Sequence, residues 1–211
     1  MTFDKEFKEA ISQLSSAEKD KLIFRLLKKD LNLANQLLFE LVSSDSKEDR
    51  REKTKEKIVN SIVRIKQHCK YSTPGMLLME MRDTNGIINE HVKITNDKYG
   101  EIYLQIFVLN EFLQIYNEYF KDCSMKQSYT LNIYCVAKVF KIMILLKKIH
   151  EDLTADFAGD LEKTGQLFGN NPCLMHSAIH NGLDVNWLIK NQIPNNVVEI
   201  EKDLRQRGYL K

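Results

Sequence analysis

The sequence predicts an all-α protein of roughly ten helices with essentially no β-sheet. Eight glycines and three prolines are eleven of the 211 residues, about 5% against the roughly 12% of average usage, so few positions interrupt a helix. Apolar residues recur at three- and four-residue spacing along most of the chain, which is the spacing of one helix face. The alternation of apolar and polar residues that marks a strand is close to absent.

The N-terminal 42 residues are expected to form three short helices. Phe3 and Phe7 lie on the apolar face of the first, and Ser15 with Glu18 has the capping-box pattern that starts the second. Asp30 is the expected N-cap of the third. Because almost nothing connects the second helix to the third, we expect these two to form an antiparallel hairpin.

Two long helices should follow the polar connector at 43–47. The first opens with the mixed-charge run 47–57, whose alternating signs are typical of a solvated helix surface. The second begins at Thr73-Pro74, a capping threonine with proline at the first helical position. Asn85-Gly86 inside this helix is a dipeptide that can bend or split it.

Two further helices are apolar around most of their circumference and should therefore be central and buried. Asn96 or Asp97 caps the first of them, and the second covers 134–149. We expect six of their side chains to be nearly inaccessible: Phe107, Leu109, Phe112, Leu113, Phe140 and Leu145.

Beyond residue 157, glycine and proline divide the chain into short helices near 160–168, 173–181, 184–191 and 196–207. We expect one domain over 1–211, with a weak boundary near 157–171. The helices should form either a bundle or an irregular stack of helix pairs, similar in architecture to HEAT or TPR arrays. No repeat signature of those families is present, so the resemblance is one of architecture alone.

Charge and composition exclude several classes of protein. Thirty-one Lys and Arg against 29 Asp and Glu leave a net charge of +2, without the strongly basic character of a dedicated nucleic-acid-binding domain. Four scattered cysteines without a CxxC pair indicate reduced thiols and a cytoplasmic protein. The start of the chain is too charged for a signal peptide, and no apolar run approaches the length of a membrane span. Nucleotide- and phosphate-binding motifs are missing, so we expect no cofactor.

Two polar clusters are candidate sites for chemistry. Glu80, Asp83 and His91 surround Asn85-Gly86, and a histidine beside carboxylates can serve in proton transfer. Cys173, His176 and His180 share one helix face and are the ligand types of zinc. For the second cluster we nevertheless expect ordinary packing and no metal, because a fourth ligand and an adjacent general base are both missing.

A third alternative is nucleic-acid binding by two basic segments, 57–70 and 121–148. The first holds four candidate phosphate contacts and no acid: Lys57, Arg64, Lys66 and Lys70. The acidic stretch 151–162 is the expected neighbour that compensates this charge, which would leave only weak, non-specific binding.

The sequence is most typical of a non-catalytic binding or scaffold protein that offers a helical surface to a protein partner. The surplus of amphipathic helices and the missing catalytic motifs favour this interpretation. An enzyme with a polar pocket near Glu80, Asp83 and His91, or a nucleic-acid-binding protein, are the alternatives. The sequence leaves the oligomeric state open.

Overall fold

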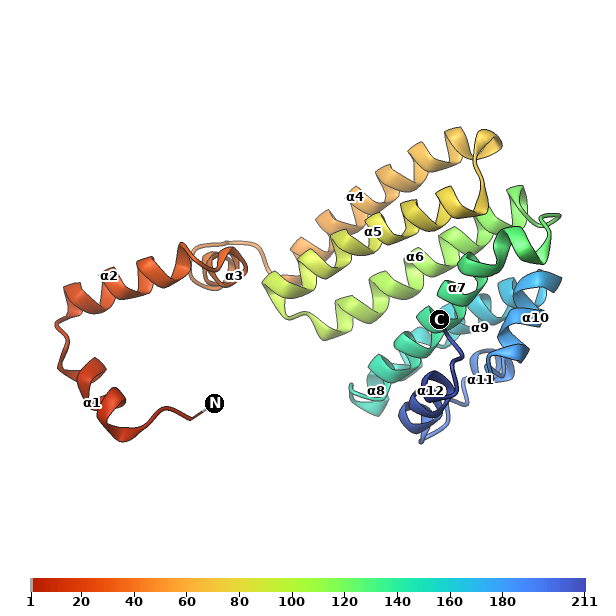
Figure 1. Cartoon of the computed structure of the whole chain (residues 1–211). Coiled ribbons are helices and arrows are strands. Elements are labelled where there is room, and N and C mark those ends of the chain that lie inside the picture. The colour runs from red at the N-terminus through yellow and green to blue at the C-terminus, as the bar shows by residue number, and fades with distance from the viewer. Residues whose placement is uncertain (1) are drawn as a thin grey trace.

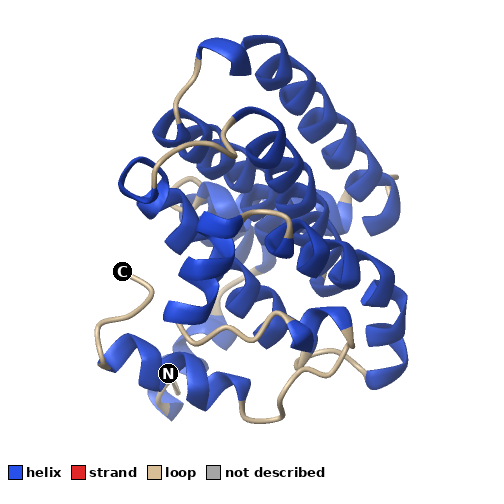
Figure 2. Ribbon diagram, turned by 90° about the vertical axis from the view of Figure 1, so that its right-hand side faces the viewer, coloured by secondary structure: helices blue, strands red, loops and turns tan. Residues whose placement is uncertain are grey.

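The computed structural model describes residues 2–211, and helices make up 78% of the chain. Figure 2 shows helices and loops without a strand in this described part, which confirms the all-α prediction. The α-helices and their bounds are α1 (Lys5–Gln13), α2 (Ser16–Leu27), α3 (Leu31–Leu41), α4 (Lys47–His68), α5 (Pro74–Thr95), α6 (Lys98–Tyr119), α7 (Met125–Leu146), α8 (Glu151–Thr154), α9 (Ala158–Gly169), α10 (Pro172–His180), α11 (Asn186–Ile189) and α12 (Val197–Gln206). Two 3₁₀ turns, Cys69–Tyr71 and Ala155–Phe157, follow α4 and α8.

Residues 47–180 form two rows of helices. α4, α6 and α9 lie side by side in one row, and α5, α7 and α10 form the other (Figure 1). Hydrogen bonds join positions 46 residues apart between α4 and α6 (Arg51 and Asp97) and 49 apart between α5 and α7 (Asn85 and Tyr134). Further along α4 and α6, Lys55 bonds Tyr103 and Lys66 bonds Glu111, at offsets of 48 and 45 residues. Because the offset stays nearly constant along the pair, α4 and α6 run parallel, and the intervening α5 runs antiparallel to both.

Asparagine side chains connect neighbouring helices of a row. The Asn110 and Asn117 amides on α6 donate to backbone carbonyls of α9, at 3.0 Å and 2.9 Å. The Asn132 amide on α7 donates to the Cys173 carbonyl on α10 at 3.3 Å. Asn110 and Asn132 are buried, and unpaired amides at these positions would destabilise the core. At the C-terminal edge the Leu210 amide donates to Asn181 Oδ1 at 3.0 Å, so the last residues cover the end of α10.

The core is centred on α6 and α7, as the sequence predicted. Leu109, Phe112, Leu113 and Phe140 are at most 1% exposed. The expectation for Phe107 and Leu145 is wrong, because both side chains are only half-buried. Phe107 lies at the side of α6 that faces α4, where the Lys55 ammonium is 5.4 Å from its ring centroid.

The helices begin where the sequence predicted, with two differences among the positions considered next. Ser15 and Glu18 form the expected capping box, and Asp30 caps α3. α5 is continuous through Asn85-Gly86, so the dipeptide does not split it. α7 begins at Met125, nine positions before the expected residue 134, because a capping box of Ser124 and Gln127 starts it there.

The first three helices project from the two rows as an arm. Figure 1 shows α2 from the side and α3 nearly end-on, so these helices cross and the expected antiparallel hairpin does not form. α3 alone packs on the rows, at the C-terminal part of α5. The guanidinium of Arg50 lies 5.7 Å from the Phe39 ring centroid and connects α3 to α4.

α7 is the one helix among residues 2–211 with the length and composition of a membrane span. Its most apolar 18-residue window has a mean hydropathy of 1.5, and 61% of that window is buried in the protein. A core helix meets the same criteria, and the burial of α7 agrees with that role.

Candidate functional site

The arm formed by α1–α3 exposes most of the large apolar side chains of the protein surface. Ten of the nineteen exposed large hydrophobic residues among those described lie between Phe3 and Val42. None of the residues in α1, α2 or α3 is buried. On α2 the exposed set includes Ile23, Phe24 and Leu26. Exposed large apolar side chains gathered in one part of a chain are the usual sign of an interaction site.

A groove between α4 and α5 brings together residues that the sequence assigned to two different functions. It encloses about 730 Å³, and Glu80 and Asp83 of α5 line it opposite Arg64 of α4. The Cys69 thiol is buried at its floor, and burial raises the pKa of this thiol. Because the reactive species of cysteine is the thiolate, Cys69 is suited to packing and unsuited to nucleophilic attack.

The charged groups of this groove are not paired with one another. The Arg64 guanidinium donates to the Ser61 hydroxyl one turn away at 3.1 Å. Within residues 2–211, no ion pair includes Arg64, Glu80 or Asp83. The groove therefore has an acidic wall and a basic residue on the opposite wall, both free to meet charges from outside.

His91 does not join Glu80 and Asp83 in this groove. It lies about 16 Å farther along α5 than Glu80, given the helical rise of 1.5 Å per residue, and is 2% exposed. The proposed catalytic grouping of the three residues is therefore not assembled. His91 instead contacts Asp97, at 3.2 Å, and the hydroxyl of Thr54, at 3.4 Å.

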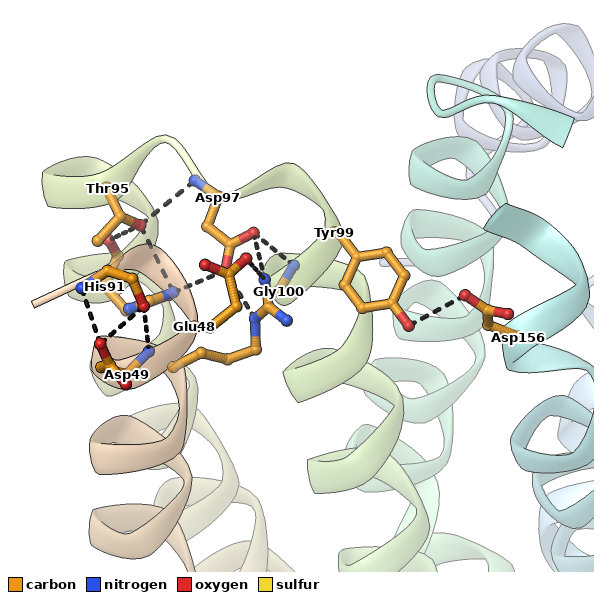
Figure 3. A network of polar contacts seen from close by, with 10 residues as sticks. Glu48, Asp49, His91, Thr95, Asp97, Tyr99, Gly100 and Asp156 are labelled. Carbon is orange, nitrogen blue, oxygen red and sulfur yellow. Dashed lines mark hydrogen bonds and ion pairs between the residues drawn. The ribbon is translucent and has the colours of Figure 1, made fainter. Parts of the chain in front are cut away.

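His91 belongs to a buried junction at the start of α6 (Figure 3). The Asp97 carboxylate caps α6 by accepting from the Gly100 amide at 2.9 Å. Arg51 donates to both oxygens of the same carboxylate, at 2.8 Å and 3.0 Å. Burial opposes ionisation of Asp97, but the hydrogen bonds from His91, Arg51 and Gly100 outweigh it and hold its pKa well below the usual range.

The junction continues from α4 to the C-terminal helices through one tyrosine. The Arg51 guanidinium lies 5.1 Å from the ring centroid of Tyr99, and the Tyr99 hydroxyl donates to Asp156 at 3.3 Å. Every polar group of this junction has a partner within the protein. The arrangement is suited to holding α4, α5 and α6 together, and Thr54 and His91 also line a hollow of about 330 Å³ between α4 and α5.

The candidate nucleic-acid residues do not form a continuous basic surface. The Lys66 ammonium is neutralised by Glu111 of α6 at 3.0 Å. Lys57 lines a separate hollow together with Glu56 and Glu90. Lys70 is exposed near the C-terminal end of α4.

The expected pairing of 57–70 with the acidic stretch 151–162 is wrong. In the described chain no ion pair joins them, because α6 lies between α4 and α9 and supplies the partner of Lys66. The second basic segment, 121–148, is also compensated in part, since Lys141 pairs with Glu101 at 3.0 Å.

Lys138, in the same segment, is buried on α7. Its ammonium lies 5.7 Å from the ring centroid of Tyr134. Burial, together with the nearby Lys141, lowers the pKa of Lys138 to about 7. This burial was not predicted from the sequence, although the apolar pattern around α7 indicates that any charge there lies close to the core.

The three zinc-type residues of α10 make ordinary packing contacts. The Cys173 thiol donates to the Cys123 carbonyl at 3.6 Å. The rings of His176 and His180 stack with centroids 6.4 Å apart, and His180 also meets Tyr209 edge to face. Among residues 2–211, no three side chains of His, Cys, Asp or Glu are grouped as a metal site.

The chain matches no protein-family model, no curated protein and no solved structure.

Proposed function

We propose that the protein is a non-catalytic binding or scaffold protein, and that α1–α3 is the surface it offers to a protein partner. The observation that carries the proposal is the set of exposed apolar side chains on an arm whose three helices bury no residue. The arm holds seven Lys and Arg and seven Asp and Glu in residues 2–42. A neutral surface of this kind favours a protein partner over the polyanions that basic surfaces attract.

The length of the arm helices supports the same proposal. α1, α2 and α3 have 9, 12 and 11 residues. Isolated helices of this length are marginal in water, because the cost of nucleation is offset by few hydrogen bonds. Burial of the apolar face against a partner supplies the stabilisation that the arm lacks by itself.

The test is capture by the tagged full-length protein from an extract of its own host cells. We expect Phe24→Glu/Leu31→Glu to lose the retained proteins, because both side chains are strongly exposed and lie on the arm. Tyr129→Glu/Ile179→Glu is the matched control, since it places the same charges on exposed apolar positions outside the arm. Equal retention by wild type and both double variants would contradict the proposal, as would the absence of any retained protein.

A further inference from the structure

The groove between α4 and α5 lies at an uncovered edge of the two rows. α4 has α6 on one side, and no helix of the arm lies on the groove, since α3 reaches only the C-terminal part of α5. Met76 of α5 lines the groove and is 52% exposed. Methionine side chains adapt to varied apolar surfaces, which suits the groove for a helix with an apolar stripe.

α2 carries a stripe and charges that complement this groove. Leu22, Ile23 and Leu26 form the apolar stripe. At the helical repeat of 3.6 residues, Arg25 forms a basic border on one side of the stripe and Asp20 borders the other. Lys29 follows in the turn after the helix ends at Leu27.

The two borders of α2 match the two walls of the groove. The basic border suits the acidic wall of Glu80 and Asp83, and Asp20 suits Arg64 on the opposite wall. None of the three groove residues forms an ion pair within the described chain, so these charges are available to an incoming helix.

From this complementarity we infer that α2 of one molecule docks in the α4–α5 groove of a second copy of the chain, and that the exchange is reciprocal. The inference rests on the proposed function, because it names the partner of the arm. One chain carries both surfaces, and Figure 1 shows α1 and α2 directed away from the groove of their own molecule. Reciprocal exchange of an identical element gives a dimer with two-fold symmetry.

The test measures self-association of the full-length protein by sedimentation velocity over about 1–100 µM, the range of micromolar dissociation constants. We expect a dimer for wild type. The arm variant Arg25→Glu/Lys29→Glu and the groove variant Glu80→Lys/Asp83→Lys should each weaken it by about tenfold or more, because like charges then face each other. Lys190→Glu/Lys202→Glu is the control for the arm variant, since it makes the same charge change at exposed positions far from the arm.

An equimolar mixture of the arm variant and the groove variant tests whether the arm of one copy meets the groove of the other. In the mixed dimer an acidic arm meets a basic groove and a basic arm meets an acidic groove, so we expect association to return to the wild-type level. Circular dichroism of each variant checks that all four substituted positions, which are exposed, leave the fold intact.

A wild-type protein that stays monomeric over this range overturns the inference, as does a mixture that fails to associate. If such a monomer still captures a different protein through Phe24 and Leu31, the proposed function stands, but a second copy of the chain is excluded as the partner of the arm. If neither self-association nor capture occurs, both proposals fail.

Discussion

The guanidinium of Arg51 on α4 holds the carboxylate of Asp97 at the start of α6 through two hydrogen bonds, of 2.8 Å and 3.0 Å. Asp97 also caps α6 and accepts from His91 on α5. One carboxylate therefore fixes the relative positions of three helices. Because both partners are largely removed from water, loss of either leaves a buried charge without its main partner.

We predict that Asp97→Asn lowers the free energy of unfolding by about 3 kcal/mol at neutral pH. The folded protein holds the pKa of Asp97 well below that of the unfolded chain, so its stabilisation is present above a pH of about 4 and is lost as the pH falls further. Urea unfolding of wild type and variant at pH 7 and pH 3 checks this. Glu48→Gln, which removes an exposed carboxylate from the same Arg51, should cost less than about 1 kcal/mol.

The second prediction concerns the core. Phe112→Ala should lower the free energy of unfolding by about 3–5 kcal/mol, because the ring is 1% exposed on the central helix. Phe107→Ala should cost less than about 2 kcal/mol, since half-burial removes less apolar surface from water. Urea denaturation of both variants measures the difference, and equal losses would show that α6 has another orientation.

Lys138 gives a pH dependence of the same sign in a higher pH range, because its folded-state pKa is also lowered. Burial lowers its pKa to about 7, so between that pH and about 10 the unfolded chain binds a proton that the folded one releases. Raising the pH over this interval therefore stabilises the wild type. We predict that Lys138→Met is more stable than wild type by a few kcal/mol at pH 7, and that the gain shrinks toward pH 10.

Unfolding titrations over that pH interval test the prediction for Lys138. Lys126→Met, an exposed position of the same helix, is the control and should show little gain at any pH. A gain for Lys138→Met that stays constant with pH would mean that its charge is not the cause.

We predict that Cys173, His176 and His180 hold no zinc. The thiol already has a backbone partner, and the two rings stack on each other. Elemental analysis of protein purified without added metal is the direct measurement, and a chelator should leave the melting temperature unchanged. Near-stoichiometric zinc that disappears in Cys173→Ser/His176→Ala would contradict this expectation.

Nucleic-acid binding should be weak, with a dissociation constant no better than about 10 µM near physiological salt. Glu111 neutralises Lys66, and acids accompany Lys57 in its hollow. A mobility-shift titration against mixed RNA and DNA measures the affinity. Submicromolar binding that weakens on Arg64→Ala would place nucleic-acid recognition ahead of the proposed function.

The sequence predicted what depends on neighbouring residues and missed what depends on tertiary contacts. The cap residues Ser15, Asp30 and Thr73 stand at the helix starts where they were expected, because a cap needs only the amides of the next turn. Of the two candidates Asn96 and Asp97, it is Asp97 that caps α6. The start of α7 was missed although Ser124 and Gln127 carry the same signal.

The candidate site was predicted in part. Amphipathic spacing showed that residues 3–41 have an apolar face, but spacing does not reveal whether another part of the chain covers that face. The junction of Arg51 and Asp97 escaped prediction because its members are 46 residues apart and meet only when α4 and α6 pack in register. Glu80 and His91 were grouped because Asn85-Gly86 was expected to bend or split the helix, and the continuous α5 keeps them apart.

The two edges of the helix rows have different consequences for polymerisation. At the C-terminal edge the chain folds back over the end of α10, where the Leu210 amide donates to Asn181. This segment covers the surface on which a further helix pair could pack. The α4–α5 edge lacks such a cover. Edge-to-edge stacking of two copies through α4 and α5 would turn a covered C-terminal edge outward on both sides, so stacking of this kind ends at a pair. Exchange of α2 is limited differently, because it closes only when both copies give and receive an arm.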